Sequence, residues 1–306
     1  MFVALTVVVT VHLLAVYLAL MGPAIGLWLQ WRAAADELAA RLDRYYLRLA
    51  VGGLLVATAA GGLAVVLIGR LFPDAYLAAA RELPTSRYWP YGAIELVFSL
   101  GCFVLALALA GHVSGPRSRF WIRWLATLLG TTNLVYHFPP LFVMLGVLCT
   151  RPDTWGHPAK FTTLLADAEV LARVSHHLLA ALAVAGLAAV WYGMRRGGEC
   201  LQAVVWGARI GVAAVVLQLL SGLWLVMAMP VETRQMLLGD DAVSSALFCA
   251  AFVGSLFVVP RLAAMALGNV ERRHALVTIS LVLAVVVLMT ATRHRTRELA
   301  VPAARE

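Results

Sequence analysis

Histidine residues lie inside several stretches of this sequence that are otherwise apolar. His12, His137 and His176 each fall within such a stretch, and His177 directly follows His176. Inside a membrane, an ionisable side chain is costly, usually faces the interior of a helix bundle, and is a candidate for function. A histidine there can form a hydrogen bond between helices, relay a proton, or ligate a metal or a haem iron. Glu95 is a carboxylate in the same kind of environment.

The three separated histidines are expected at nearly one depth in the membrane. With a helical rise of about 1.5 Å per residue, each lies about 12–15 Å below the outer surface, and Glu95 lies slightly nearer that surface. For any one histidine, a hydrogen bond across helices is an equally good interpretation. Three at one level favour a metal or a haem iron.

Arg173 completes the set that a haem would need. Two histidines on opposing helices can ligate one iron from both faces, while the ring needs apolar walls and a cation for its propionates. Arg173 is three residues before His176, on the same helix face and one turn nearer the outer surface, which predicts a propionate partner. His176 and His177 point about 100° apart around the helix, so one iron is expected to use only one of them.

The elements that position these residues are long apolar runs. Of the 306 residues, 62% are hydrophobic and 13% are charged, whereas charged residues make up about a quarter of soluble domains. Each run can supply the roughly 20 residues of a membrane-spanning helix and lacks the alternation of a barrel strand. The sequence therefore predicts an all-α polytopic membrane bundle, one domain over residues 1–306. Its eight expected spans are 2–30, 49–72, 91–112, 120–147, 168–193, 201–229, 243–262 and 274–292.

The connections between these runs predict the topology. One set of loops carries twelve Lys and Arg residues and the alternate set carries seven, so the positive-inside rule places both termini outside. The arginine-rich tail after residue 292 would then lie on the outer side. The stretch 31–46 contains helix formers with Glu37 and Arg41 at i,i+4, which predicts that the first helix continues into the cytoplasm. Two longer connections, about 73–90 and 148–167, suit an interfacial cap.

Charge and cysteine content exclude several functions. The net charge of +8 comes from arginines spread over the loops and not from a basic stripe, so no nucleic-acid partner is expected. The four cysteines form neither a C-x-x-C pair nor a C-x-x-C-H motif. Covalent c-type haem and cysteine-ligated zinc are therefore not expected.

The order of these features resembles subunit I of the cytochrome bd quinol oxidases, over about residues 1–229. "VHLLAVYLALMGPAIGLWLQWR" is similar to the family's first span, and its haem-ligand histidine matches His12. "YGAIELVFSLG" is similar to the A-I-E segment, whose glutamate, in the proton and active-haem region, matches Glu95.

The fourth and fifth spans extend the resemblance. "RWLATLLGTTNLV" is similar to W-L-x-x-L-G-S-N-L through residues that include Trp124 and Asn133. "ARVSHHLLAALAVAGLAAVWYGMRRG" is similar to K-F-V-H followed by small residues and A-W-Y-M-L-K-G. The low-spin b-haem histidine of the family matches His176, and Arg173 stands at the basic position before it.

The chain also departs from the family's pattern. A second glutamate expected two turns after Glu95 is replaced by Phe103, and no long quinol-binding loop follows the sixth run. No G-R-Q-P-W segment or methionine axial ligand matches in the seventh run, and His137 stands where the family usually has another residue. Residues 230–306 therefore form two further, divergent helices of a shortened relative.

The resemblance implies a haem-b-binding electron-transfer subunit of a respiratory complex in the bacterial inner membrane, in contact with other membrane subunits. His12 and His176 would be iron ligands, His137 an additional or replacement ligand, Glu95 a proton-active or ligand-supporting group, and Arg173 the propionate partner. His177 would bond a backbone carbonyl, contact a second cofactor or fill an interface. A second haem of b or d type would fit, and electrons would come from a periplasmic cytochrome c or a quinol.

Other functions stay open for the same residues. Among enzymes, the alternative is a functioning small terminal oxidase. A haemless copper-handling transporter or assembly factor could use the same histidines together with Met227 and Met229. A structural subunit of a membrane complex would use the histidines only to join helices.

Overall fold

The computed structural model describes residues 2–83, 89–110, 117–151 and 160–300. Within these ranges, eight helices are long and apolar enough to cross a membrane, which confirms the predicted all-α bundle of a multi-pass membrane protein. They are α1 (Phe2–Arg32), α2 (Glu37–Leu71), α4 (Trp89–Leu109), α5 (Arg117–Leu148), α7 (Ala168–Arg196), α8 (Leu201–Ala228), α10 (Ala242–Ala266) and α11 (Arg272–Ala300). The predicted spans agree with these helices except at some ends.

Shorter elements lie in the connections. They are α3 (Pro73–Glu82), α6 (Phe161–Leu165), the single turn η3 (Gly198–Cys200), α9 (Val231–Gln235) and η4 (Met236–Asp240). The two connections predicted to form an interfacial cap thus contain the helices α3 and α6, while residues 84–88 and 152–159 lie outside the described ranges.

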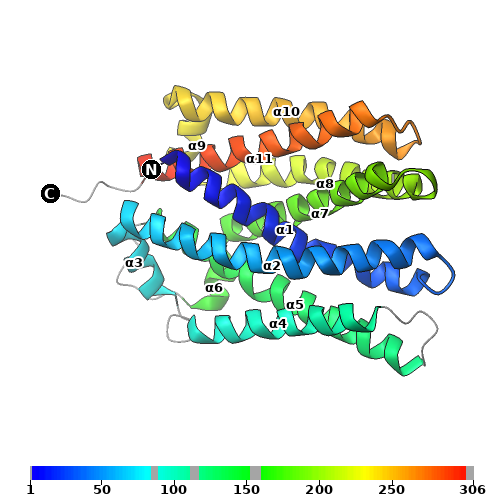
Figure 1. Ribbon diagram of the computed structural model, residues 1–306. Coiled ribbons are helices and arrows are strands. Elements are labelled where there is room, and N and C mark those ends of the chain that lie inside the picture. Colours follow the sequence, from blue (N-terminus) through cyan, green and yellow to red (C-terminus); the bar gives the residue numbers. More distant parts are fainter. Residues whose placement is uncertain (1, 84–88, 111–116, 152–159, 301–306) are drawn as a thin grey trace.

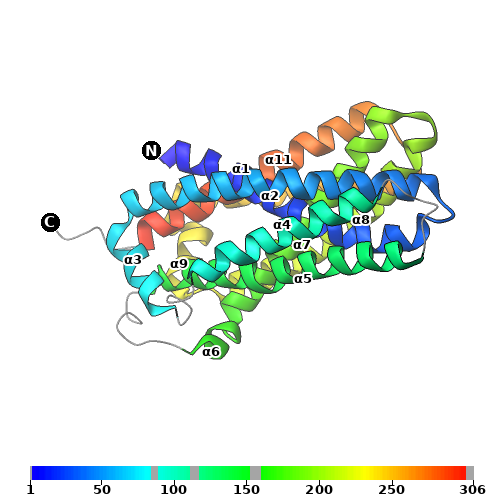
Figure 2. The same ribbon diagram turned by 60° about the horizontal axis from the view of Figure 1, so that its bottom comes forward.

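Helix α7 is the centre of the bundle. It packs against α8, α1, α5 and α11, while α2 packs on α1, α4 packs on α5, and α10 packs on α8 and α11. The α4–α5 pair lies at one edge and α10 at the other (Figure 1). Figures 1 and 2 show that α1 begins and α11 ends at the same end of the bundle. We call this the terminal end, and the other the opposite end.

The connection between α1 and α2 corrects the prediction that the first helix continues into the cytoplasm. Helix α1 ends at Arg32 instead of continuing through residues 31–46, and α2 already begins at Glu37. The reason is local: the Asp36 side chain accepts a hydrogen bond from the Ala39 backbone N–H at 3.1 Å and thereby caps α2. The helix formers of this stretch therefore belong to the second helix.

The last helix, α11, corrects a second prediction, the end of the last span. It continues to Ala300, eight residues past the predicted end of the span. Most of the arginine-rich segment after residue 292 is thus helical rather than a tail, and Arg297 is 9% exposed.

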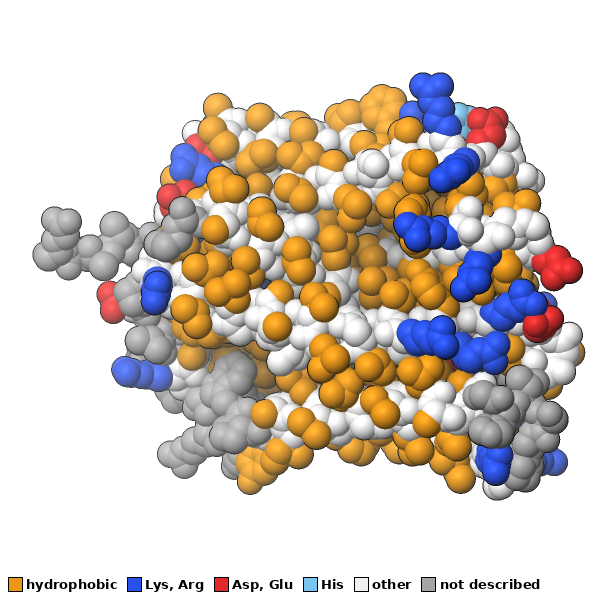
Figure 3. Space-filling view, viewed as in Figure 1, with side chains coloured by type: hydrophobic (Ala, Val, Ile, Leu, Met, Phe, Trp, Pro, Cys, Tyr) orange, Lys and Arg blue, Asp and Glu red, His pale blue; other side chains and the backbone are white. Residues whose placement is uncertain are grey.

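Basic side chains gather at the opposite end. Figure 3 shows a band of hydrophobic side chains across the middle of one face and most of that face's Lys and Arg side chains on the right, beyond the band. The α1–α2, α7–α8 and α10–α11 turns lie at that end (Figure 1). The positive-inside rule predicts such an asymmetry.

Helices α7 and α8 approach each other through two glycines. A Cβ built on Gly186 would lie 2.6 Å from the backbone oxygen of Gly207, and one on Gly207 would lie 2.9 Å from the backbone nitrogen of Val190. Backbone atoms cannot give way as a flexible side chain can. The small residues of α7 therefore let α8 pack closely here, as glycines do in many membrane helix pairs.

Replacing Gly207 with alanine is expected to separate α7 from α8. We expect a loss of about 1–3 kcal/mol in the free energy of unfolding, the usual cost of forcing extra atoms into a packed interface. Thermal unfolding in detergent measures it. Gly62→Ala on α2 is the matched control, because nothing lies within 4 Å of its added Cβ. An unchanged midpoint for Gly207→Ala would show that this interface is looser than described.

Candidate functional site

His12 lies between α1 and α2. Its Nδ1 is 2.8 Å from the backbone oxygen of Ala57. Because a carbonyl oxygen can only accept, Nδ1 carries the proton and donates, and Nε2 keeps its lone pair. A Cβ at position 61 would come within 2.8 Å of His12 Cε1, so Gly61 makes room for the ring. Among the described residues, Nε2 has no hydrogen-bond partner.

His137 and Glu95 meet between α5 and α4. His137 Nδ1 is 3.3 Å from Glu95 Oε1 and 3.1 Å from Asn133 Oδ1. Asn133 in turn donates from Nδ2 to the Glu95 backbone oxygen at 3.0 Å and to Ser99 Oγ at 2.8 Å. The side chains of His137 and Glu95 are 40% and 33% exposed. The arrangement can share a proton between an imidazole and a carboxylate near the bundle surface.

His176 turns toward α8. Its Nδ1 is 3.3 Å from Ser221 Oγ, and that hydroxyl already donates to the Gln218 backbone oxygen, so it accepts from His176. The Nε2 atom is 3.5 Å from the Gln218 side-chain nitrogen, which is the outer limit for a hydrogen bond. Nε2 of His176 is therefore only weakly engaged.

His177 turns away from its neighbour and toward α1. Its Nδ1 is 2.7 Å from the hydroxyl of Tyr17, a residue that is 5% exposed. The two adjacent histidines thus contact different helices, as their angular separation around α7 predicts. The partner of His177 is a phenol and not the backbone carbonyl that was one of the options.

The structure does not bring His12, His137 and His176 to a common point. They lie at three different interfaces, α1–α2, α4–α5 and α7–α8. Within the described ranges, no group of three or more His, Cys, Asp and Glu side chains is arranged to hold a metal ion. A haem does not need such a group, because its iron takes at most two axial protein ligands. Met227, offered above as a thioether ligand, is 67% exposed.

The helix that carries His176 is loosely packed around these residues. Every residue from 173 to 179 is partly exposed, although this stretch covers nearly two turns and α7 has neighbours on several sides. One turn later the packing tightens, since Ala183 through Leu187 are all buried. The residues around the two histidines are therefore less completely buried than the following turns of α7.

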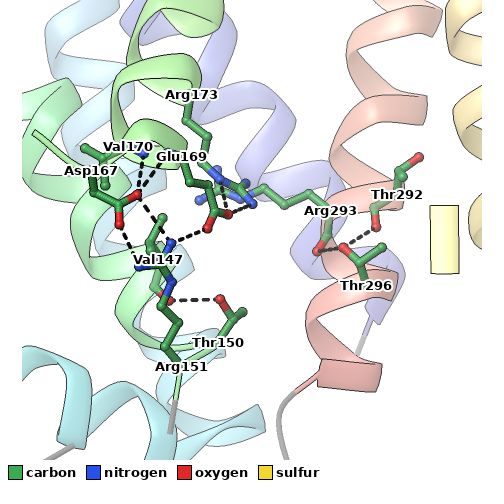
Figure 4. A network of polar contacts seen from close by, with 10 residues as sticks. All are labelled: Val147, Thr150, Arg151, Asp167, Glu169, Val170, Arg173, Thr292, Arg293 and Thr296. Carbon is green, nitrogen blue, oxygen red and sulfur yellow. Dashed lines mark hydrogen bonds and ion pairs between the residues drawn. The ribbon is translucent and has the colours of Figure 1, made fainter. Parts of the chain in front are cut away.

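Arg173 belongs to a network at the terminal end (Figure 4). Its Nε and Nη2 donate to Glu169 Oε1 at 2.9 and 2.5 Å, and Arg151 Nη2 donates to Glu169 Oε2 at 2.8 Å. Glu169 is 1% exposed, so it is held buried between two guanidinium groups. Arg173 is not a free cation, because Glu169 occupies two of its nitrogens.

Asp167 joins the same network and caps α7. It accepts from Arg151 Nη1 at 2.7 Å and from the backbone N–H of Glu169 at 2.9 Å. Burial alone would raise the pKa of the Asp167 carboxyl, but the hydrogen bonds from Arg151 and the backbone outweigh it and lower this pKa below its ordinary value. The carboxylate is therefore ionised at neutral pH.

Two sets of polar residues inside the bundle, some of them buried, were missed from the sequence. Arg293 and Arg297 line a pocket with Arg173; their i,i+4 spacing in "TRHRTR" is a signal that they share a helix face. At the opposite end, the fully buried Asp43 pairs with Arg123 and accepts from Gln30 Nε2 at 3.2 Å. Asp43 gave no signal, because it lies in a segment with several other charges.

Comparison with known proteins adds no relative. No protein-family model matches the chain, and no curated protein matches it. The resemblance to cytochrome bd subunit I therefore rests on the short motifs of the helices themselves.

Proposed function

We propose that this protein is a haem-b-binding electron-transfer subunit of a membrane respiratory complex, similar to cytochrome bd subunit I. The observation that carries the proposal is the geometry of His12. Histidines that ligate metals almost always donate their second ring N–H to a carbonyl or carboxylate, which fixes the tautomer and aims the free nitrogen. His12 has this arrangement already, with Ala57 as its acceptor and Nε2 left free.

The donor set and its surroundings fit a haem. Imidazole is a common axial ligand of haem iron, and a haem macrocycle binds between apolar side chains. Residues 173–179 around His176 are partly exposed, and the weak contact of Nε2 with Gln218 can be given up at little cost. A bound haem b would supply reversible one-electron transfer.

We assign His12 and His176 to different irons. His12 is held against α2 through Ala57, and His176 is held against α8 through Ser221. These contacts place the two imidazoles at different helix interfaces, which favours one iron for each. His137 remains an additional or replacement ligand, and its contact with Glu95 would hold a proton between Nδ1 and Oε1.

Arg173 is proposed as the propionate partner of the His176 site. It lies one helical turn from His176, and its Nη1 is the guanidinium nitrogen that Glu169 leaves unused. The pairing with Glu169 holds the guanidinium in place, which favours a fixed carboxylate position.

Haem and copper content test the proposal against its alternatives. The full chain is purified in mild detergent from cells supplied with haem precursor, and haem b and copper are measured per chain. Haem b at or above a one-to-one ratio supports the proposal. Stoichiometric copper without haem would support a copper-handling protein. The absence of both haem and copper would support a structural subunit. Either result would reject the haem proposal.

A further inference from the structure

A pocket at the terminal end is lined by basic side chains from separate helices. Arg173 comes from α7, and Arg293 and Arg297 come from α11. Thr150, Thr233 and Thr296 complete most of the lining. The pocket is partly open to solvent.

The positive charges around this pocket exceed the negative ones. Glu169 and Asp167 balance Arg173 and Arg151. Neither Arg293 nor Arg297 has a carboxylate partner among the described residues. Arg297 is nevertheless 9% exposed. Burying a guanidinium without an anion is costly. Arg293 and Arg297 therefore favour binding an anion that the described residues do not supply.

Gly146 leaves room for the Arg293 guanidinium. Its side chain reaches from α11 toward Glu169 and Arg173 (Figure 4). A Cβ at position 146 would lie 2.6 Å from Arg293 Nη2, so Gly146 on α5 leaves the space that this group occupies. The hydroxyls of Thr150 and Thr296 donate to backbone oxygens, and the guanidinium groups are the strong donors that remain for a ligand.

We propose that this pocket binds a phosphate group. Guanidinium pairs match the oxygens of a phosphate with parallel hydrogen bonds, and Arg293 and Arg297 together carry more N–H donors than the two oxygens of a carboxylate can accept. The pocket lies at the last turns of the membrane-spanning helices, which is the depth of lipid headgroups. The phosphate would come from an anionic phospholipid or from a soluble phosphate compound. This inference goes beyond the haem proposal and does not depend on it, because it rests on Arg293 and Arg297, whereas Arg173 is assigned to a propionate.

Titration of the full chain tests the site. The protein is purified in detergent, washed free of lipid, and titrated with inorganic phosphate at constant ionic strength or with phosphatidylglycerol in mixed micelles. Sodium chloride and phosphatidylcholine are the respective controls. Binding is measured by native mass spectrometry and by the thermal unfolding midpoint. We expect R293Q/R297Q to bind at least about tenfold more weakly than wild type, since each variant position removes a charge-assisted hydrogen bond.

Two further variants separate binding from folding. Gly146→Ala keeps every charge but displaces the Arg293 guanidinium, and we expect it to weaken binding while the helix stays intact. Arg295→Gln removes the same charge from the same turn of α11, where Arg295 pairs with Asp241 and Glu298 instead, and should leave binding unchanged. Binding of phosphatidylglycerol alone identifies a lipid, and binding of inorganic phosphate identifies a soluble ligand. The proposal is overturned if neither probe binds above its control, or if Gly146→Ala and R293Q/R297Q bind as wild type does.

Discussion

Glu169→Gln is expected to lower the free energy of unfolding by about 3–5 kcal/mol, because breaking a buried ion pair leaves an uncompensated charge. Glu169 is 1% exposed and accepts from both Arg151 and Arg173. Without this carboxylate, Arg173 loses its ion-pair partner and Arg151 keeps only Asp167. The measurement is chemical or thermal unfolding of the purified chain in detergent.

The matched control for this variant is Glu298→Gln. Glu298 also pairs with an arginine, Arg295, but its side chain is 50% exposed, so we expect a loss of at most about 1 kcal/mol. The double variant Glu169→Gln with Arg173→Gln should recover part of the lost stability, because it also removes a buried positive charge. A Glu169→Gln protein as stable as the control would show that the network contributes little.

His12→Ala is expected to weaken haem binding at its site by at least about a hundredfold. Loss of an outer-shell partner of a metal ligand already costs about 10–100-fold in affinity, so loss of the ligand should cost more. The readout is a haemin titration of the purified chain followed by its Soret band.

Gly61→Ala tests the same site without removing the imidazole. Its Cβ would press on His12 Cε1, so we expect a shifted spectrum with the haem retained. His274→Ala is the control, because His274 lies in the first turn of α11 with its side chain 48% exposed. Equal haem binding by wild type and His12→Ala would exclude His12 as a ligand.

The sequence predicted the elements better than the contacts between them. Hydropathy and length give the spans, and helix geometry gives the different directions of His176 and His177. Most spans are apolar on every face, so periodicity does not reveal which helix each histidine faces. The sequence therefore predicted only a similar depth for His12, His137 and His176, and the structure distributes them among three interfaces.

The helix ends show a second limit. The cap at Asp36 decides where α2 begins. The end of α11 was predicted too early, because charges such as the arginines after residue 292 usually mark the end of a span. Two of these charges, Arg293 and Arg297, line a pocket together with residues far away in the sequence. A contact between residues so far apart in the sequence cannot be predicted from a local pattern.

The absorption spectrum of the purified wild-type chain tests the haem proposal most directly. We predict a Soret band and, after reduction with dithionite, a sharp α-band of low-spin haem b that His176→Ala diminishes. A chain that is folded, was expressed with adequate haem supply and shows no Soret band would contradict the proposal.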